Sequence, residues 1–212
     1  MTETADTLDQ QVRTADLDRW LSSRLVADDR ARADLITLYA FEAELMTIPA
    51  RVTQPLLAEM RYTWWAEQMD GVFAGVPRKG HPVLEALTDL VARHGLDRAP
   101  FDTLIDAHIG RVREQPHDLD AFYVGPMQVA TRVLAGQGHD DAVADAARVW
   151  GLTQTGRRQE AAASLKSAAN GALKRLPPEG FAAVAHATLT DPDQPEPLKR
   201  LRLLWAVLRG RI

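Results

Sequence analysis

Carboxylates recur along two consecutive segments of the chain, at spacings that could place them on helix faces. Glu42 lies in the first segment, and Glu59, Glu67 and Asp70 lie in the second. Carboxylate oxygens are the ligands that Mg²⁺ prefers, so acids on related helix faces could hold a cation. The same acids could instead lie in solvent and pair with basic residues such as Arg61, which is common on protein surfaces. We prefer the ion-pair interpretation.

Glu42 differs from the other acids because it falls on an apolar helix face. It follows Leu38 by one helical turn and shares that face with Tyr39. A carboxylate that leaves water needs a hydrogen-bonded or charged partner. We therefore expect Glu42 to form a buried ion pair that holds two helices together, with a partner such as Arg61 or Arg51.

Several other chemistries have little support. The chain has no cysteine, which excludes disulfides, thiolate metal sites and a cysteine nucleophile. The six histidines show no metal-ligand spacing, and His108 is expected to be a core residue. The net charge of -4 gives no overall attraction to nucleic acid, so we expect no nucleic-acid partner.

Apolar residues recur with the helical period of 3.6 along most of the 212 residues, and no segment alternates as a strand does. We therefore predict an all-α fold of about nine or ten helices. Residues 1–15 are predicted to be a polar N-terminal tail, and residues 16–212 a single helical domain. The predicted helices are Asp16–Val26, Asp29–Thr47, Pro55–Ala74, Pro82–His94, Pro100–Glu114, Leu119–Ala135, Asp140–Thr155, Gln159–Arg175, Pro178–Ala187 and Pro197–Arg209.

Three features bear on packing and location. Adjacent tryptophans, Trp64 and Trp65, point about 100° apart on a helix, so burial of both predicts a central, widely covered helix. The acidic N-terminus lacks the pattern of a targeting segment, from which we expect a cytoplasmic protein. The segment 197–212 is basic and amphipathic, so it could close the core, or it could lie on the inner face of a membrane as a peripheral contact.

Motifs in the first half of the chain resemble the squalene/phytoene synthase family in both residue type and order. They are Asp18-Arg19-Trp20, Leu38-Tyr39-Ala40-Phe41 with Glu44-Leu45, Glu59-Met60-Arg61 with Trp64-Trp65, and His81-Pro82-Val83. The resemblance covers about Asp16 to Val129 well and the rest weakly. It implies an isoprenoid-synthase-like helical bundle, here shortened in its second half.

The family also implies a reaction and a cofactor. Its members join two prenyl diphosphates, using magnesium held by two aspartate-rich motifs on facing helices. The resemblance places the first motif from Met46 to Ala50, and neither of these side chains can ligate magnesium. The second motif would fall in residues 152–161, where there is one glutamate and two arginines. Both aspartate-rich motifs are therefore missing.

These departures favour a non-catalytic family member. We expect a scaffold or assembly factor, by analogy with the mitochondrial respiratory complex I assembly factor of the same family, or a lipid-binding module. The expected partners are a protein or an isoprenoid or other lipid, with no cofactor. The alternative is an active Mg²⁺-dependent prenyl transferase whose metal site is rebuilt from Glu42, Glu44, Glu59 and Glu67. The residues expected to face a cavity or a diphosphate are Tyr39, Glu42, Arg51, Glu59, Arg61, Trp64 and Trp65, and none is assigned as catalytic or metal-binding.

Overall fold

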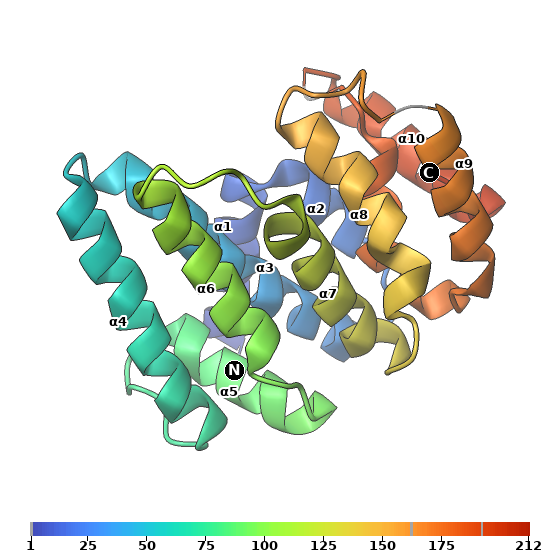
Figure 1. Cartoon of the computed structure of the whole chain (residues 1–212). Coiled ribbons are helices and arrows are strands. Elements are labelled where there is room, and N and C mark those ends of the chain that lie inside the picture. Colours follow the sequence, from blue (N-terminus) through green and yellow to red (C-terminus); the bar gives the residue numbers. More distant parts are fainter. Residues whose placement is uncertain (1, 162, 192) are drawn as a thin grey trace.

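The computed structural model describes residues 2–161, 163–191 and 193–212, and these residues form helices and turns with no strand (Figure 1). The predicted all-α class is confirmed. The α-helices are α1 (Thr2–Ala15), α2 (Leu17–Ser23), α3 (Asp29–Arg51), α4 (Pro55–Phe73), α5 (Pro82–His94), α6 (Ala99–Val112), α7 (Gly125–Ala135), α8 (Asp140–Gln154), α9 (Ala163–Ala172) and α10 (Glu196–Arg209). Shorter elements are the π-helical turn η1 (Asp120–Val124) and the 3₁₀ turns η2 (Leu173–Arg175), η3 (Pro178–Ala183) and η4 (Ala185–Thr188).

Helix α3 is the central element of the fold. It packs against α1, α2, α4, α5 and α7, and its middle residues from Asp34 to Ala43 are all buried. In Figure 1 it runs behind a row formed by α4, α6, α7 and α8. Because α3 is covered on nearly all sides, a polar side chain in its middle has to find a partner inside the protein.

Helix α4 is not central, so that prediction from the tryptophan pair is wrong. It lies at the outer edge of the molecule (Figure 1), where Trp65 is buried but Trp64 is only half-buried. Trp65 packs edge-on against Phe41 of α3, with ring centroids 5.5 Å apart. Trp64 lies against His81, with ring centroids 5.7 Å apart, and His81 also contacts Trp65, at 5.3 Å. Trp64 thus lies at the margin of the core.

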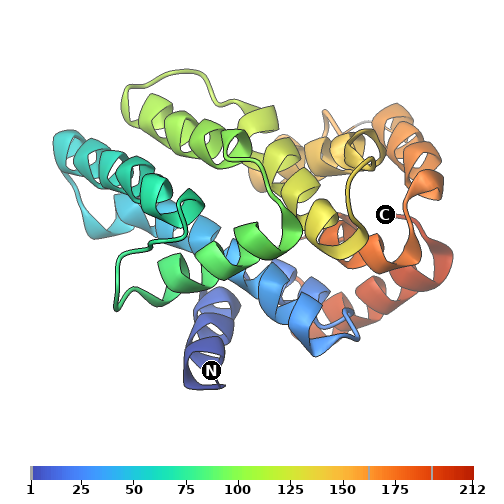
Figure 2. The same cartoon turned by 90° about the horizontal axis from the view of Figure 1, so that it is seen from below.

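The N-terminal segment, predicted as a polar tail, forms helix α1 instead. Leu8 and Val12, one helical turn apart, are buried, and the helix packs against α3. Its start projects from the rest of the molecule (Figure 2). Polar contacts also hold α1, since Asp9 accepts a hydrogen bond from Trp20 Nε1 at 2.9 Å. Two apolar residues in a polar stretch were too weak a signal for a packed helix.

The C-terminal turn of α3 contains Pro49, and the helix continues to Arg51 rather than ending at Thr47. Proline has no N–H to donate to the carbonyl four residues earlier, which here is that of Leu45. The hydroxyl of Tyr62 on α4 donates to this carbonyl at 3.1 Å. A side chain of the next helix therefore satisfies the acceptor that the proline leaves without its helical partner.

The second half of the chain departs most from the predicted helices. The single helix expected from Leu119 to Ala135 begins with a π-helical turn, and the helix expected at Pro178–Ala187 is two 3₁₀ turns. The π turn η1 packs closely on α8, where a Cβ on Gly151 would lie 2.5 Å from the ring of Tyr123. Residues 180–187 are all buried. Tertiary packing rather than helical propensity determines the local structure there.

Candidate functional site

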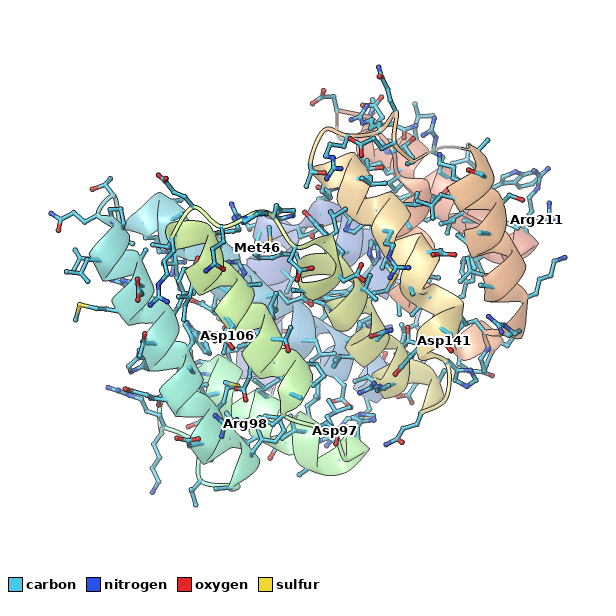
Figure 3. All side chains as sticks on the ribbon, in the orientation of Figure 1. Met46, Asp97, Arg98, Asp106, Asp141 and Arg211 are labelled. Atoms are coloured by element: carbon cyan, nitrogen blue, oxygen red, sulfur yellow. The ribbon has the colours of Figure 1, made fainter. Side chains whose placement is uncertain are left out.

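A cavity of about 70 Å³ lies where α2, α3, α6, η1 and α8 meet. Glu42 and Met46, one turn apart on α3, both line it. Figure 3 places Met46 near the loop that follows α6. The complete lining is Asp16, Arg19, Glu42, Met46, Leu104, His108, Arg111, His117, Phe122, Tyr123, Trp150 and Gln154.

Arg19 and Glu42 form an ion pair inside this cavity wall. Arg19 Nη1 donates to Glu42 Oε2, and the two residues are 6% and 7% exposed. Asp16 caps the start of α2 by accepting the backbone N–H of Arg19 at 2.9 Å, and its other oxygen lies 3.6 Å from Arg19 Nε. One guanidinium is thus held between two carboxylates from different elements.

Burial and charge act in opposite directions on this pair. Burial raises the pKa of Glu42, and Arg19 partly counteracts this effect. Burial lowers the pKa of Arg19, but the carboxylates of Glu42 and Asp16 outweigh it, so the pKa rises overall and the guanidinium stays charged. Glu42 is therefore engaged with a permanent cation and is not a free metal ligand.

Behind the ion pair lies a neutral polar cluster. The guanidinium of Arg19 is 5.4 Å from the centroid of the Tyr39 ring, and His186 lies between Tyr39 at 6.5 Å and Trp150 at 4.9 Å. Burial raises the pKa of Tyr39 and lowers that of His186 well below its usual value. Both side chains are therefore uncharged at neutral pH. Tyr39 Oη and both ring nitrogens of His186 have no hydrogen-bond partner among the described residues.

The opposite wall of the cavity is aromatic. His108 is 2% exposed, which confirms its predicted place in the core. It stacks on Tyr62, with centroids 5.0 Å apart, and meets the edge of Phe122 at 4.9 Å. Burial, with the nearby charge of Arg111, lowers the pKa of His108 to about 3. The imidazole is therefore a neutral packing element at neutral pH.

The structure brings together only part of the predicted site. Glu42 lines the cavity, whereas Tyr39 is buried and is not among the residues that line it. The expected buried ion pair between two helices is confirmed, but neither named partner contacts Glu42, because Arg51 pairs with Glu44 at 3.5 Å and Arg61 is exposed. Arg51 lies nine positions after Glu42 along the same helix, too far along the axis for a contact.

The remaining predicted site residues lie on α4, away from the cavity lining. Trp64 and Trp65 belong to the aromatic packing between α4 and its neighbours. Glu59 pairs with Arg113, and Asp70 pairs with Arg98. For these two acids the preferred ion-pair interpretation is confirmed, although both partners come from the α6 region and not from α4 itself.

Sequence reasoning missed Arg19, Trp150 and His186, which complete the interior. Arg19 stands inside the Asp18-Arg19-Trp20 motif, so the signal was available. A charged residue placed between Leu17 and the apolar pair Trp20-Leu21 in a short helix is a candidate for a buried pair. No comparable signal identifies Trp150 and His186, because their contact depends on how α8 packs on the η4 turn.

The residues around the cavity mouth do not fit a magnesium–diphosphate site. Met46, 58% exposed, and Ala50 occupy the positions of the first expected motif. Gln154, the last residue of α8, lies within residues 152–161, where the second was expected. The acids of the lining are Asp16 and Glu42, and both lie against Arg19. Over the described part of the chain, no group of three or more histidine, aspartate or glutamate side chains could hold a metal ion.

The cavity is also small for a prenyl substrate. Ligand pockets usually enclose about 300–1,000 Å³, whereas this one measures about 70 Å³, enough for roughly two water molecules. A wider groove, about 570 Å³, lies elsewhere, between α1, α3 and α5. Charged side chains line it, and there Asp34 already pairs with Arg93 and His94.

Comparison with known proteins identifies the family. The sequence model of the squalene/phytoene synthase family matches residues 12–124, which is more than half of the chain. The match includes α2, α3, α6 and η1, and therefore most of the cavity wall. No curated protein matches the sequence significantly. From the family match we conclude that this chain belongs to the squalene/phytoene synthase family.

Proposed function

We propose that this protein is a non-catalytic member of its family that works as a scaffold in the assembly of other proteins. The observation that carries the proposal is the pair of substitutions on α3. Met46 and Ala50 stand where the family pattern places its first metal-binding carboxylates, while the one buried acid nearby, Glu42, is bound by Arg19. The family scaffold is thus present without the groups that its reaction needs.

The chemistry explains why these groups matter. A diphosphate leaves only when its developing negative charge is neutralised, and Mg²⁺ bridged to carboxylates provides this in the family reaction. Glu59 is committed to Arg113, Glu44 to Arg51, and Glu42 to Arg19. Glu67 is exposed on α4, outside the cavity lining. A metal site rebuilt from these four acids would require breaking three ion pairs, so the prenyl transferase alternative is less well supported.

The small cavity favours binding of a partner at the protein surface over binding of a ligand in the interior. A carrier of isoprenoid chains would need a long apolar tunnel, whereas the cavity measures about 70 Å³ and has the charged Arg19–Glu42 pair in its wall. The assembly role itself rests on analogy with the complex I assembly factor, whose domain belongs to the same family. Our proposal therefore concerns binding of a protein partner at the outside of the helical scaffold.

Ligand binding by the purified protein tests the non-catalytic part of the proposal. A ligand present at a hundred times its dissociation constant stabilises the folded state by about 2.7 kcal/mol, which raises the melting temperature by several degrees in a domain of this size. We expect no such rise with Mg²⁺ and geranylgeranyl diphosphate together. A rise that requires both ligands and is lost in Glu42→Gln would contradict the proposal.

Isolation of complexes tests the scaffold part. The tagged chain, cross-linked in cells and purified under denaturing conditions, should yield a defined protein partner in stoichiometric amount. Tagging that partner should recover this chain in return. Recovery of the chain alone in both directions would overturn the assembly role while leaving the ligand experiment unaffected.

A further inference from the structure

Helix α10 touches the rest of the protein along a narrow line. Only Lys199, Leu203 and Ala206, spaced by four and three residues, are buried. Lys199 Nζ donates to Asp18 Oδ1 at 2.7 Å and is itself buried, which fixes the helix to α2. Of the six large apolar residues between Leu201 and Leu208, only Leu203 is buried. Most large apolar side chains of α10 therefore do not contact the core.

The opposite side of α10 is apolar and exposed to solvent. At about 100° per residue, five large side chains fall within an arc of roughly 120° directly opposite the buried line. They are between 48% and 78% exposed. The five residues, called here the apolar arc, are Leu198, Leu201, Leu204, Trp205 and Leu208. Such a continuous apolar stripe on a surface helix usually marks an interaction site.

Arginines border the apolar arc. Arg202, Arg209 and Arg211 line a surface groove of about 300 Å³ beside Trp205, and the guanidinium of Arg209 lies 4.3 Å from the Trp205 ring centroid. None of these three arginines forms an ion pair with a carboxylate of the described residues. Figure 3 shows Arg211 at the outer edge of the molecule. This groove thus offers three cationic donors next to an apolar surface.

The local charge is opposite to that of the whole protein. The chain carries a net charge of -4, whereas the segment 196–212 has five basic residues and one acidic residue, Glu196. Glu196 pairs with Arg200, and Lys199 pairs with Asp18. The charge left over belongs to the three arginines of the groove, so the unpaired positive charge lies on α10 and the residues just after it, beside the apolar arc.

We propose that α10 docks this protein on the surface of an anionic lipid bilayer. The apolar arc would enter the boundary between headgroups and acyl chains, while Arg202, Arg209 and Arg211 contact lipid phosphates. Helix α10 has 14 residues, and over the described residues no helix combines the length and the apolar character needed to cross a membrane. The contact is therefore peripheral and lies in the plane of the surface.

A bilayer suits this surface better than a second copy of the chain. Packing α10 against α10 of another molecule would bring together the unpaired arginines of both copies, and like charges repel. An anionic bilayer instead neutralises these charges and covers the arc at the same time. This inference goes beyond the scaffold function and does not depend on it, because it concerns where the protein lies and not what it assembles.

Vesicle flotation with the full chain tests the proposal. We expect binding to vesicles of phosphatidylcholine with phosphatidylglycerol and little binding to phosphatidylcholine alone. Each basic residue at a membrane surface changes affinity about fivefold, so Arg202→Gln, Arg209→Gln and Arg211→Gln together should weaken binding about a hundredfold. A matched control replaces Arg30, Arg61 and Arg158, three exposed arginines elsewhere, with glutamine and should bind as the original chain does.

The apolar arc is tested separately. Leu201→Ser with Leu208→Ser should weaken vesicle binding roughly tenfold or more, because exposed leucines lose their transfer into the interface without disturbing the core. Equal losses in the groove and control arginine variants would overturn the proposal, as would unchanged binding in the leucine variant. Light scattering measures the oligomeric state of the chain and of the leucine variant. A dimer that the leucine substitutions convert to a monomer would show that a second copy covers the apolar arc, and would also overturn the proposal.

Discussion

Arg19 on α2 and Glu42 on α3 form a buried ion pair at the wall of the central cavity, 23 residues apart in the sequence. The pair connects the short helix α2 to the central helix α3. It lies next to the positions where the family pattern places metal ligands. Glu42 looked like a candidate ligand because it is an acid on an apolar face. Its partner makes it a structural residue.

Removal of Arg19 should be costly because it leaves Glu42 buried without a cation. Arg19→Met is expected to lower the free energy of unfolding by about 3–5 kcal/mol at pH 8. The pKa of Glu42, already raised by burial, should rise further in this variant. The folded state then binds a proton that the unfolded state has lost, so the deficit should shrink as pH falls from 8 toward 5. Urea unfolding at both pH values measures this change.

Glu42→Gln with Arg19→Met gives the matched control. The double variant has no buried carboxylate at this position, so its deficit relative to the original chain should stay constant between pH 8 and pH 5. A pH dependence as large as that of the single variant would show that Glu42 is not the group responsible.

His108 should contribute to the loss of stability in mild acid. Its folded-state pKa is lowered to about 3 from an ordinary value of 6.5, chiefly by burial, so the unfolded state binds the proton first. Stability from this group is present above pH 6.5 and is lost as pH falls below it. His108→Phe should therefore lose about 1.4 kcal/mol less than the original chain between pH 7.5 and pH 5.5. Equal losses in the two proteins would contradict this assignment.

Gly151 is expected to be required for the contact between α8 and the η1 turn. A Cβ there would lie 2.5 Å from the Tyr123 ring and 3.1 Å from Leu119, so Gly151→Ala should destabilise the fold by about 1–3 kcal/mol. Gly171 on α9 faces open space, because no atom of another element lies within 4 Å of the position that a Cβ would take. Gly171→Ala should therefore stabilise by about 0.5–1 kcal/mol through helix propensity. Thermal unfolding of both variants tests the contrast, and similar effects would argue against it.

The hydrogen bond from Tyr62 to the Leu45 carbonyl should depend on Pro49. Tyr62→Phe leaves that carbonyl buried and without its donor, at an expected cost of about 1–3 kcal/mol. In a Pro49→Ala background the new backbone N–H can donate to the same carbonyl, so Tyr62→Phe should cost clearly less there. A double-mutant cycle by urea denaturation measures the coupling. Additive effects would mean that the proline and the tyrosine act independently.

Much of the fold could be predicted from the sequence because the helices show strong periodicity and proline starts. The helix Pro82–His94 was predicted with its observed bounds, and the apolar face around Leu38 and Tyr39 is buried in α3. Helix α1 was missed because only Leu8 and Val12 report its packing. The η3 and η4 turns were missed because an alanine-rich stretch favours α-helix until neighbouring elements constrain it.

The site was harder to predict than the fold. The burial of Glu42 followed from its spacing to Leu38, but the choice of Arg19 over Arg51 required knowing how α2 crosses α3. Ion-pair partners across helices depend on tertiary geometry, which periodicity does not encode. The apolar arc of α10 likewise could not be distinguished from a core face by sequence alone, since both give the same amphipathic pattern.

Product analysis with the purified protein tests the central claim most directly. The chain is incubated with Mg²⁺ and farnesyl or geranylgeranyl diphosphate, and released pyrophosphate is measured against a heat-inactivated control. We predict no release above that control, because Met46 and Ala50 cannot hold the metal and Arg19 engages Glu42. Release of pyrophosphate that depends on Mg²⁺ and disappears in Glu42→Ala or Glu67→Ala would contradict the account and establish an active prenyl transferase.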